Sequence, residues 1–549
     1  MYILKDKIGY SKKKILFGLI IISLISLCLK LYTTEFSSLP PEDVFGYTLR
    51  AFSHNNGDFT EPARKTLGWS LVISPFFKLV DSDYFLDYVN VVRILSLSIS
   101  TILIFPMYLL ARRFTNEKYS LVAAFLLAIE PHLNHNAGLG LSEPLFILVM
   151  ILSIYFILTK DTRLFCLSFL LAGVMWWIRF NGIVMLPILL LILILNSKRS
   201  LKIIPVLLLC TSLFLIVTSP MLLQRYAQYG DPFYFSQSDT LYTGEFVTVV
   251  AENTKGTSYS ASNYIADYGM VQFIWKFVLG GLYNLGDQVI KLLYPYMIVL
   301  LPMGMFFSFR AFDQNSNYIK ANWIVIIITL GSFVTYFAVI QERRLIFHLI
   351  PFFIIFAIIP IQRLVEYGLS TFSFSQKQKN YSLVIVLSIA LLLAITFTLR
   401  YDLTDTTKEQ EKIELGQYLL SQHEGKILDT GNALEGLVYA KIESQSNNFK
   451  NYMIKNDLDA KNEKIQTISL YAKSMTDFIT VAEQHDLKYV IINRDEVTTV
   501  WYPFFENVYD SESSYPYLVK ITDSTQLGFK KLNVKVFQID YNKFHELNN

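Results

Sequence analysis

Long apolar stretches recur through the first 400 or so residues of this 549-residue chain. A helix needs about 20 apolar residues to cross the roughly 30 Å hydrocarbon core of a bilayer. About eleven segments meet or approach this length, some with the help of flanking residues: 15–32, 88–110, 119–131, 142–159, 164–178, 183–195, 203–219, 289–309, 321–340, 351–366 and 381–399. The sequence therefore predicts an α-helical polytopic membrane protein.

The composition agrees with this class. Charged residues make up 17% of the chain, whereas soluble domains contain roughly 25%. The net charge of +3 gives no indication of nucleic-acid binding. All three cysteines (Cys28, Cys166 and Cys210) fall within predicted spans, so no disulfide framework is expected.

The loops predict the orientation, because short loops rich in Lys and Arg stay in the cytoplasm. Lys12–Lys14 place the N-terminus inside, and no cleavage site follows the first apolar run, so that run is expected to be an uncleaved anchor. Every second loop is basic: 112–118, 160–163, 197–202, 310–320 and 376–379. The other loops then lie outside: 33–87, 132–141, 179–182, 220–288, 341–350 and everything after 400. We expect a multi-pass protein of the cell membrane with an extracytoplasmic C-terminal part.

The chain changes character after residue 400, where long apolar runs end. Helices are predicted at Glu411–His423 and Asp477–His485, and strands at Lys488–Ile492 and Asn533–Ile539. This part contains no nucleotide-binding loop, zinc-ligand spacing or nucleophile elbow. We therefore predict two domains, a transmembrane domain over 1–400 and a small, non-catalytic α/β domain over 401–549.

The first outer loop contains two candidate groups. Glu42 and Asp43 follow the first membrane helix directly, and like charges this close raise one pKa, which suits a general base. The alternative is a solvated charge or a helix N-cap. Arg64 and Lys65 suit a phosphate group, although ordinary contact with anionic lipid explains them equally well.

Two later outer loops add further candidates. Glu143 follows Ser142, a plausible N-cap, so Glu143 serves either chemistry or the helix N-terminus. Arg343 and Arg344 break the positive-inside rule, and Glu342 alone cannot neutralise both, which favours phosphate binding. Arg179, after Trp176 and Trp177, is interpreted as a snorkelling residue of an aromatic belt, the alternative being a contact with lipid phosphate. The spacing of the outer histidines matches no metal motif: His54, His132, His135 and His348.

In their order and common sidedness, these motifs resemble GT-C fold glycosyltransferases that use polyprenyl-phosphate sugars, the group of protein O-mannosyltransferases and lipid A aminoarabinose transferases. The resemblance rests on Glu42-Asp43 with Tyr47, on Lys65-Thr66-Leu67-Gly68-Trp69, on Ser142-Glu143-Pro144, on Tyr229–Tyr234 and on Glu342–Pro351 with Arg343, Arg344 and His348. It implies that Asp43 is the catalytic base and that Lys65 contacts the donor phosphate. Many relatives have Asp before Glu, whereas here Glu42 precedes Asp43. Catalytic candidates are Asp43, Glu42 and Glu143. Phosphate-binding candidates are Lys65, Arg64, Arg343 and Arg344, and substrate-binding candidates are Tyr47, Trp69 and His348.

The resemblance implies inverting transfer of a sugar from a polyprenyl-phosphate donor to a lipid, glycan or protein acceptor at the outer face. A divalent metal ion is compatible with this reaction but is not required, because phosphate is a good leaving group. The oligosaccharyltransferase catalytic subunit begins similarly, but its Trp-Trp-Asp signature is missing after residue 400. The alternative from another class is a transporter or flippase of a lipid-linked glycan, which predicts inverted repeats and polar sites near the bilayer midplane.

Overall fold

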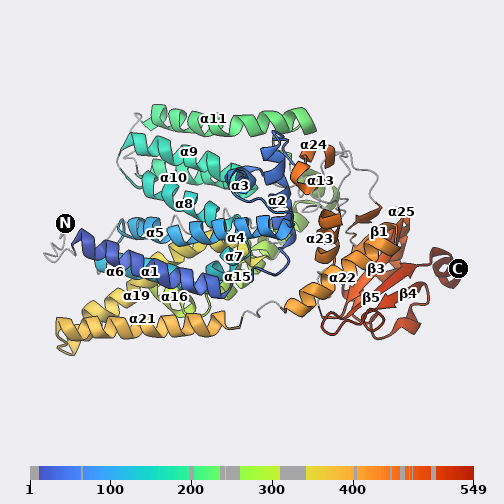
Figure 1. Cartoon of the computed structure of the whole chain (residues 1–549). Coiled ribbons are helices and arrows are strands. Elements are labelled where there is room, and N and C mark those ends of the chain that lie inside the picture. The colour runs from blue at the N-terminus through green and yellow to red at the C-terminus, as the bar shows by residue number, and fades with distance from the viewer. Residues whose placement is uncertain are drawn as a thin grey trace.

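A long helical bundle joins a smaller α/β domain at one end, and the N-terminus lies at the opposite end of the bundle (Figure 1). The computed structural model describes residues 11–62, 66–159, 161–196, 203–234, 242, 260–309, 342–400, 405–431, 433–444, 448–457, 464–468, 470, 472, 474–495 and 502–548. The α-helices of the bundle are α1 (Lys12–Tyr32), α2 (Glu42–Asn55), α3 (Gly68–Phe77), α4 (Phe85–Ile102), α5 (Ile104–Ala111), α6 (Glu117–Ala128), α7 (Pro131–Gly138), α8 (Glu143–Ile157), α9 (Thr162–Ile178), α10 (Met185–Asn196), α11 (Ile203–Tyr229), α13 (Ala261–Tyr268), α14 (Met270–Phe273), α15 (Gly281–Leu292), α16 (Met297–Phe309), α19 (Ile350–Arg363), α20 (Leu369–Thr371) and α21 (Gln376–Thr398). Short 3₁₀ segments η1 (Phe180–Val184) and η4 (Arg343–Leu349) and π-helical segments η2 (Ile274–Gly280) and η5 (Leu364–Gly368) complete it.

Five helical segments among the described residues are long and apolar enough to cross a membrane. They are Lys12–Tyr32, Phe85–Ala111, Ile203–Tyr229, Arg343–Thr371 and Gln376–Thr398. The pair Met270–Leu292 and Met297–Ser308, bent by 112°, adds a sixth if it forms one broken span. The predicted span 321–340 lies outside the described residues, so the count of about eleven stays a prediction.

The predicted span 119–131 is divided between α6 and α7. Pro131 occupies the first turn of α7, where its missing N–H leaves no partner unsatisfied. The Glu130 carboxylate caps this helix by accepting from the Leu133 N–H at 2.7 Å. The local chemistry of Glu130 and Pro131 thus starts a new helix inside an apolar stretch that hydropathy alone treats as one segment.

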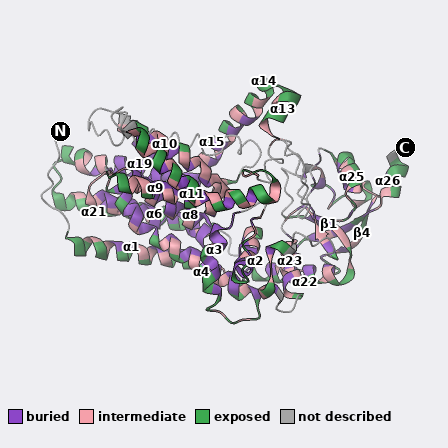
Figure 2. Cartoon of the chain, turned by 90° about the horizontal axis from the view of Figure 1, so that it is seen from above, coloured by how far each residue is buried: buried purple, intermediate pink, exposed green. Residues whose placement is uncertain are grey.

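Buried residues fill the middle of the bundle, whereas α1 and α21 carry many exposed ones (Figure 2). The exposed side chains on these two helices include large apolar ones, such as Phe17 and Leu392, as expected for helices that contact lipid. Within the core, α16 crosses α19 at Gly304, where a Cβ atom would overlap the Phe356 carbonyl oxygen. The absence of a side chain at Gly304 therefore permits this close helix crossing.

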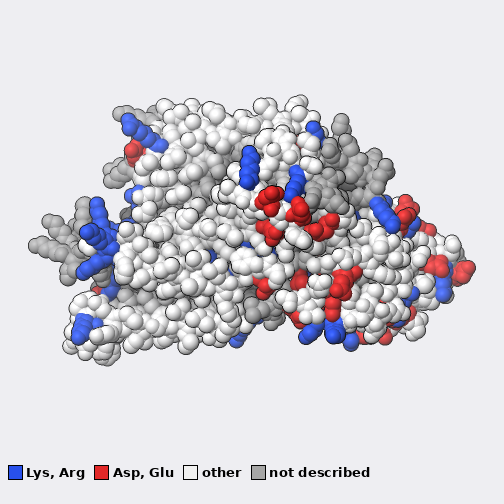
Figure 3. Space-filling view, viewed as in Figure 1, with Lys and Arg blue, Asp and Glu red and all other residues white. Residues whose placement is uncertain are grey.

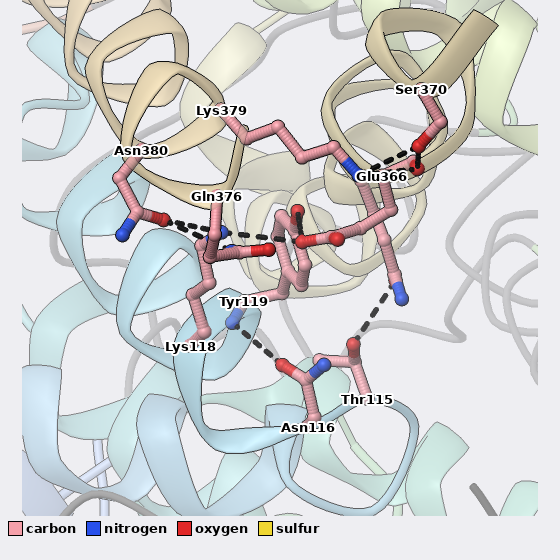
Figure 4. Close-up of polar contacts among 10 residues, drawn as sticks. Thr115, Asn116, Lys118, Tyr119, Glu366, Ser370, Gln376, Lys379 and Asn380 are labelled. Atoms are coloured by element: carbon pink, nitrogen blue, oxygen red, sulfur yellow. Dashed lines mark hydrogen bonds and ion pairs between the residues drawn. The ribbon is translucent and has the colours of Figure 1, made fainter. Parts of the chain in front are cut away.

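At the end of the bundle far from the α/β domain (Figure 1), two loops predicted on the same side of the membrane meet through polar contacts, which Figure 4 shows in close-up. Lys118, at the start of α6, lies 3.2 Å from Glu366 and 3.1 Å from Asn380. The Tyr119 hydroxyl donates to the same Glu366 carboxylate at 2.7 Å. Lys and Arg side chains gather at this end, and acidic ones gather toward the α/β domain (Figure 3). The relative sidedness of the 112–118 and 376–379 loops is therefore as predicted.

The C-terminal domain is built around a five-stranded sheet of order β2 (Ile465–Thr467), β1 (Gly425–Asp429), β3 (Leu487–Asn493), β5 (Val534–Ile539) and β4 (Leu518–Asp523). β1 is parallel to β2 and β3, and β5 is antiparallel to β3 and β4; in register, Ile427 of β1 pairs with Thr467 and Tyr489, and Val490 pairs with Phe537. Its elements are α22 (Thr406–Gln422), β1 (Gly425–Asp429), α23 (Glu435–Ser444), η6 (Asn448–Asn451), α24 (Ile454–Asp457), β2 (Ile465–Thr467), α25 (Met475–Gln484), β3 (Leu487–Asn493), β4 (Leu518–Asp523), β5 (Val534–Ile539) and α26 (Tyr541–Asn548). The four elements predicted in this part are confirmed with shifted ends. α22 begins five residues earlier than predicted because Asp405 caps it, accepting from Thr407 N–H at 3.0 Å.

Candidate active site

Helix α2 carries the predicted base. It begins at Glu42 after the N-cap residue Pro41, so Asp43 lies in the first turn and is not itself the N-cap. Acidic residues there are stabilised by the positive end of the helix dipole. Asp43, Tyr47 and Arg50 are spaced i, i+4 and i+7 and share one face. Val44, Ala51 and Phe52 bury another face against the bundle.

Asp43 forms an ion pair with Arg344, which lies on η4 in the predicted outer loop 341–350. Nη1 of Arg344 lies 2.6 Å from Oδ2 of Asp43, and Nε of Arg344 lies 2.6 Å from Oε2 of Glu342. Both side chains of the first pair are partly exposed, at 29% and 20%. The predicted base and a predicted phosphate-binding residue are therefore neighbours that solvent can reach.

A second group of polar side chains lies beside this pair. The hydroxyls of Tyr47 and Ser142 are hydrogen bonded at 3.3 Å, and Arg179 Nη1 donates to the Ser142 hydroxyl at 3.5 Å. Arg179 also forms an ion pair with Glu143 at 2.5 Å. Ser142 makes no capping bond at α8, contrary to expectation, because its hydroxyl is engaged by Tyr47 and Arg179. Arg179 is not a snorkelling residue, since its guanidinium points to the buried Glu143.

Charge interactions connect the two groups into one site. Arg344 interacts with Glu143 as well as with Asp43, and Arg179 interacts with Arg344 and Tyr47. Burial, together with the nearby Asp43 carboxylate, raises the pKa of the Tyr47 phenol to about 12. Tyr47 therefore keeps its proton at neutral pH and can donate a hydrogen bond, but it cannot serve as a base.

The segment that leads into α2 is held from two sides. The buried guanidinium of Arg93, in α4, donates to the carbonyl oxygens of Phe36 at 3.1 Å and Ser38 at 2.9 Å. Glu409 of the C-terminal domain accepts from the Leu39 N–H at 3.0 Å. These contacts fix the chain just before Asp43. In the sequence, their only sign is that Arg93 is a charged residue within an otherwise apolar helix.

Trp69 supports the site from the core. It is completely buried, and its indole N–H donates to the Gly140 carbonyl at 3.1 Å, just before Ser142. The next residue, Ser70, donates its hydroxyl to the Tyr47 carbonyl at 3.0 Å. Helix α3 thus connects α2 with the start of α8, and Trp69 does not line the open side of the site.

Arg64 and Lys65 lie outside the described residues, but the chain just before them is anchored. Glu61 forms an ion pair with Arg225 of α11 at 2.9 Å, and both side chains are fully buried. The Tyr229 hydroxyl donates to the Glu61 carbonyl at 3.1 Å. The resemblance motif around Tyr229 therefore holds the loop that carries the predicted phosphate-binding residues.

The remaining candidates occupy the surroundings of the site. Glu42 is exposed on α2. Arg343 lies close enough to His132 for their charges to interact. His348 is buried edge-on against Phe146 at 5.9 Å and interacts with Arg179. Within the described part of the chain, no group of three or more His, Cys, Asp or Glu side chains is arranged to hold a metal ion.

Comparisons with known proteins bear on the fold of the chain. The family model described as dolichyl-phosphate-mannose-protein mannosyltransferase matches residues 68–223. The Archaeoglobus fulgidus oligosaccharyltransferase AglB, in complex with an inhibitory peptide and a dolichol-phosphate, is similar in structure with a TM-score of 0.58 and 12% identity, over 93% of this chain and 73% of that one. The same enzyme tethered to an acceptor peptide gives a TM-score of 0.55 and 14% identity, over 95% and 74%. The chain has the GT-C fold.

ArnT from Cupriavidus metallidurans, bound to undecaprenyl phosphate, is less similar in structure. The TM-score is 0.49 and the identity is 12%, over 94% of this chain and 97% of that one. A comparison with curated protein sequences finds no match. The similarity in structure to AglB confirms the polytopic GT-C fold predicted from the sequence. The similarity to an oligosaccharyltransferase concerns this fold, and the Trp-Trp-Asp signature remains missing from the C-terminal sequence.

Proposed function

We propose that this protein is an integral membrane glycosyltransferase that moves a hexose or pentose from a polyprenyl-phosphate donor to an acceptor, with inversion. The observation that carries the proposal is the meeting of Asp43 with Arg344, beside Glu143 and Arg179, at the end of the bundle next to the C-terminal domain. The family model and the dolichol-phosphate bound to AglB support a lipid-phosphate donor. The acceptor is a lipid, glycan or protein, and the site and C-terminal domain face away from the cytoplasm.

In this mechanism the Asp43 carboxylate takes the proton of an acceptor hydroxyl. The acceptor oxygen attacks the anomeric carbon from the side opposite the phosphate, and the bond between that carbon and the phosphate oxygen breaks. The electron pair leaves with the polyprenyl phosphate, whose charge is stabilised by Arg344 and, in our proposal, by Lys65, Arg64 and Arg343. The activated donor makes a nucleotide-binding loop unnecessary.

The other candidates bind and orient the substrate in this proposal. Tyr47, which keeps its proton, donates a hydrogen bond, and His348 interacts with Arg179. Glu143 neutralises Arg179 and so fixes the Ser142 hydroxyl against Tyr47. Trp69 acts from the core by fixing Gly140.

The test is single-turnover transfer from a synthetic polyprenyl-phosphate sugar, with donor binding measured separately. Asp43→Asn keeps the shape of the side chain but removes its basicity, so transfer should slow by about 10²–10⁴-fold. Glu42→Gln, the same kind of change at the exposed neighbour, is the matched control and should have a small effect. If Asp43→Asn transfers normally while Glu42→Gln is inactive, Glu42 is the base. Transfer from a nucleotide sugar in a lipid-free assay would refute the donor class.

A further inference from the structure

One aromatic residue of the C-terminal domain lies in the core of the membrane domain. Phe449, in η6, is 1% exposed and is part of a cluster of residues from α2, α3 and α4. Its ring centroid lies 5.4 Å from that of Phe52 in α2, 5.5 Å from Phe85 and 6.1 Å from Tyr88, both in α4, all in edge-on geometry. Such aromatic pairs add to the stabilisation that burial itself provides.

Hydrogen bonds join the same segment to the C-terminal end of α2. The Asn56 side chain donates to the carbonyl oxygens of Lys450 at 2.8 Å and Tyr452 at 3.2 Å. In the opposite direction, Ile454 N–H donates to the Ser53 hydroxyl at 3.1 Å, and Lys455 N–H donates to the Asp58 carboxylate at 3.0 Å. The backbone of 450–455 therefore holds the end of α2 in a defined place.

The C-terminal domain also contacts the chain on both sides of this helix. Glu409 accepts from the Leu39 N–H ahead of α2, and Glu443 accepts from the Phe85 N–H at the start of α4 at 3.1 Å. Arg344, by contrast, lies on η4, which packs on α8 and α15. The distance between Asp43 and Arg344 thus depends on where α2 lies relative to the bundle, and the C-terminal domain holds α2 together with α3 and α4.

We infer that Phe449 is a positioning residue that orders α2 and so holds Asp43 against Arg344 and the donor phosphate. The inference rests on the proposed function for its kinetic consequence. A helix is a stiff rod with a rise of about 1.5 Å per residue, so Asp43 lies roughly 13 Å along the axis from Phe52. A tilt at the Phe52 end is transmitted to Asp43, and a displacement of about 1 Å at a reacting group can cost about 10²-fold in rate.

The experiment compares three variants of the full-length protein. Phe449→Ala removes the aromatic ring that packs between α2 and α4, and Phe449→Leu keeps an apolar side chain there. Phe544→Ala is the control, because it removes a buried phenylalanine from the core of the C-terminal domain itself. Phe449→Ala should lower kcat by about 10- to 100-fold with little change in the KM for donor. Phe449→Leu should recover most of that loss, and Phe544→Ala should lower the melting temperature without the selective loss of kcat.

Hydrogen exchange gives a readout that does not depend on activity. Amides of 42–55 should exchange faster in Phe449→Ala than in the parent protein and Phe544→Ala. Unchanged exchange in α2, or equal kcat losses in the two alanine variants, would overturn the inference. If Phe449→Ala does not fold, Asn56→Ala, which removes two exposed hydrogen bonds, should still give a selective loss of kcat of several-fold, and a parent-like kcat would refute the role. A parent protein that transfers no sugar refutes the proposed function, while the exchange result still decides whether Phe449 orders α2.

Discussion

The guanidinium of Arg344 donates to the Asp43 carboxylate at 2.6 Å, although the two residues are 301 positions apart. While this contact is in place, the Asp43 oxygen that accepts from Arg344 is occupied and does not face an acceptor hydroxyl. A donor phosphate that binds Arg344 would compete with Asp43 for the same N–H groups. We therefore expect donor binding to release Asp43 for proton transfer, so that the donor binds before the acceptor reacts.

The two neighbouring arginines should differ in their effect on donor use. Arg344→Ala removes the partner of Asp43 and a charged hydrogen bond worth about 1.5–3 kcal/mol, so donor affinity should fall by about 10- to 100-fold. Arg343→Ala is the matched control at the next position, and its effect should be smaller because Arg343 interacts with His132. Titration of transfer rate against donor concentration measures both. Equal losses in the two variants would contradict the assignment of Arg344.

Tyr47→Phe should lower the rate without altering its pH dependence. The variant loses the hydrogen bond to Ser142, worth about 0.5–1.5 kcal/mol, or up to about tenfold. Toward high pH the transfer rate should stay level in both proteins, because a phenol with a pKa of about 12 remains protonated below pH 10. A pH–rate profile of both proteins between pH 4 and 10 is the measurement. A falling limb in the parent that disappears in the variant would mean that Tyr47 titrates in this range.

The buried pair of Glu61 and Arg225 should be sensitive to the loss of one partner. Glu61→Gln leaves the Arg225 cation buried without its counter-ion, which costs about 3–5 kcal/mol. The double change Glu61→Leu with Arg225→Met should recover most of that stability. Asp287→Asn serves as a control, because its pair with Lys291 is 43% and 49% exposed and contributes about 1 kcal/mol or less. The measurement is thermal unfolding in detergent of the parent protein, Glu61→Gln, the double variant and Asp287→Asn. A Glu61→Gln variant as stable as Asp287→Asn would exclude a structural role for the pair of Glu61 and Arg225.

Gly68→Ala should damage the site through helix packing. A Cβ atom at Gly68 would lie 2.5 Å from the carbonyl carbon of Trp177, two residues before Arg179. Overpacking of this kind costs about 1–3 kcal/mol and would displace Arg179 from Glu143. Gly286→Ala is the matched control, since nothing lies within 4 Å of the position its Cβ would occupy. Melting temperature and transfer rate should both fall for Gly68→Ala alone.

The sequence by itself determined the class of the protein, the positions of the long apolar helices and of some elements of the C-terminal domain, and the loops that carry the candidate site residues. These properties are local: apolar length predicts α1 and α21, alternation predicts β5, and charge at loop ends predicts Asp43, Glu143 and Arg344 as candidates. The same local patterns gave wrong roles for Ser142 and Arg179. A serine before a helix usually caps it, and an arginine after an apolar helix usually snorkels, so local patterns predict these common roles even where the side chains form other contacts.

Only the tertiary structure decided which of these residues meet. Ser142 lies 95 positions from Tyr47 and 37 from Arg179, and no spacing in the sequence encodes such contacts. Nothing in the sequence distinguishes Phe449 from an ordinary core residue of the C-terminal domain. In the structure, it packs between α2 and α4 of the membrane domain. The physical reason is that burial and ion pairing depend on distances in space, which the packing of the whole bundle sets, whereas helix and strand formation depend on near neighbours along the chain.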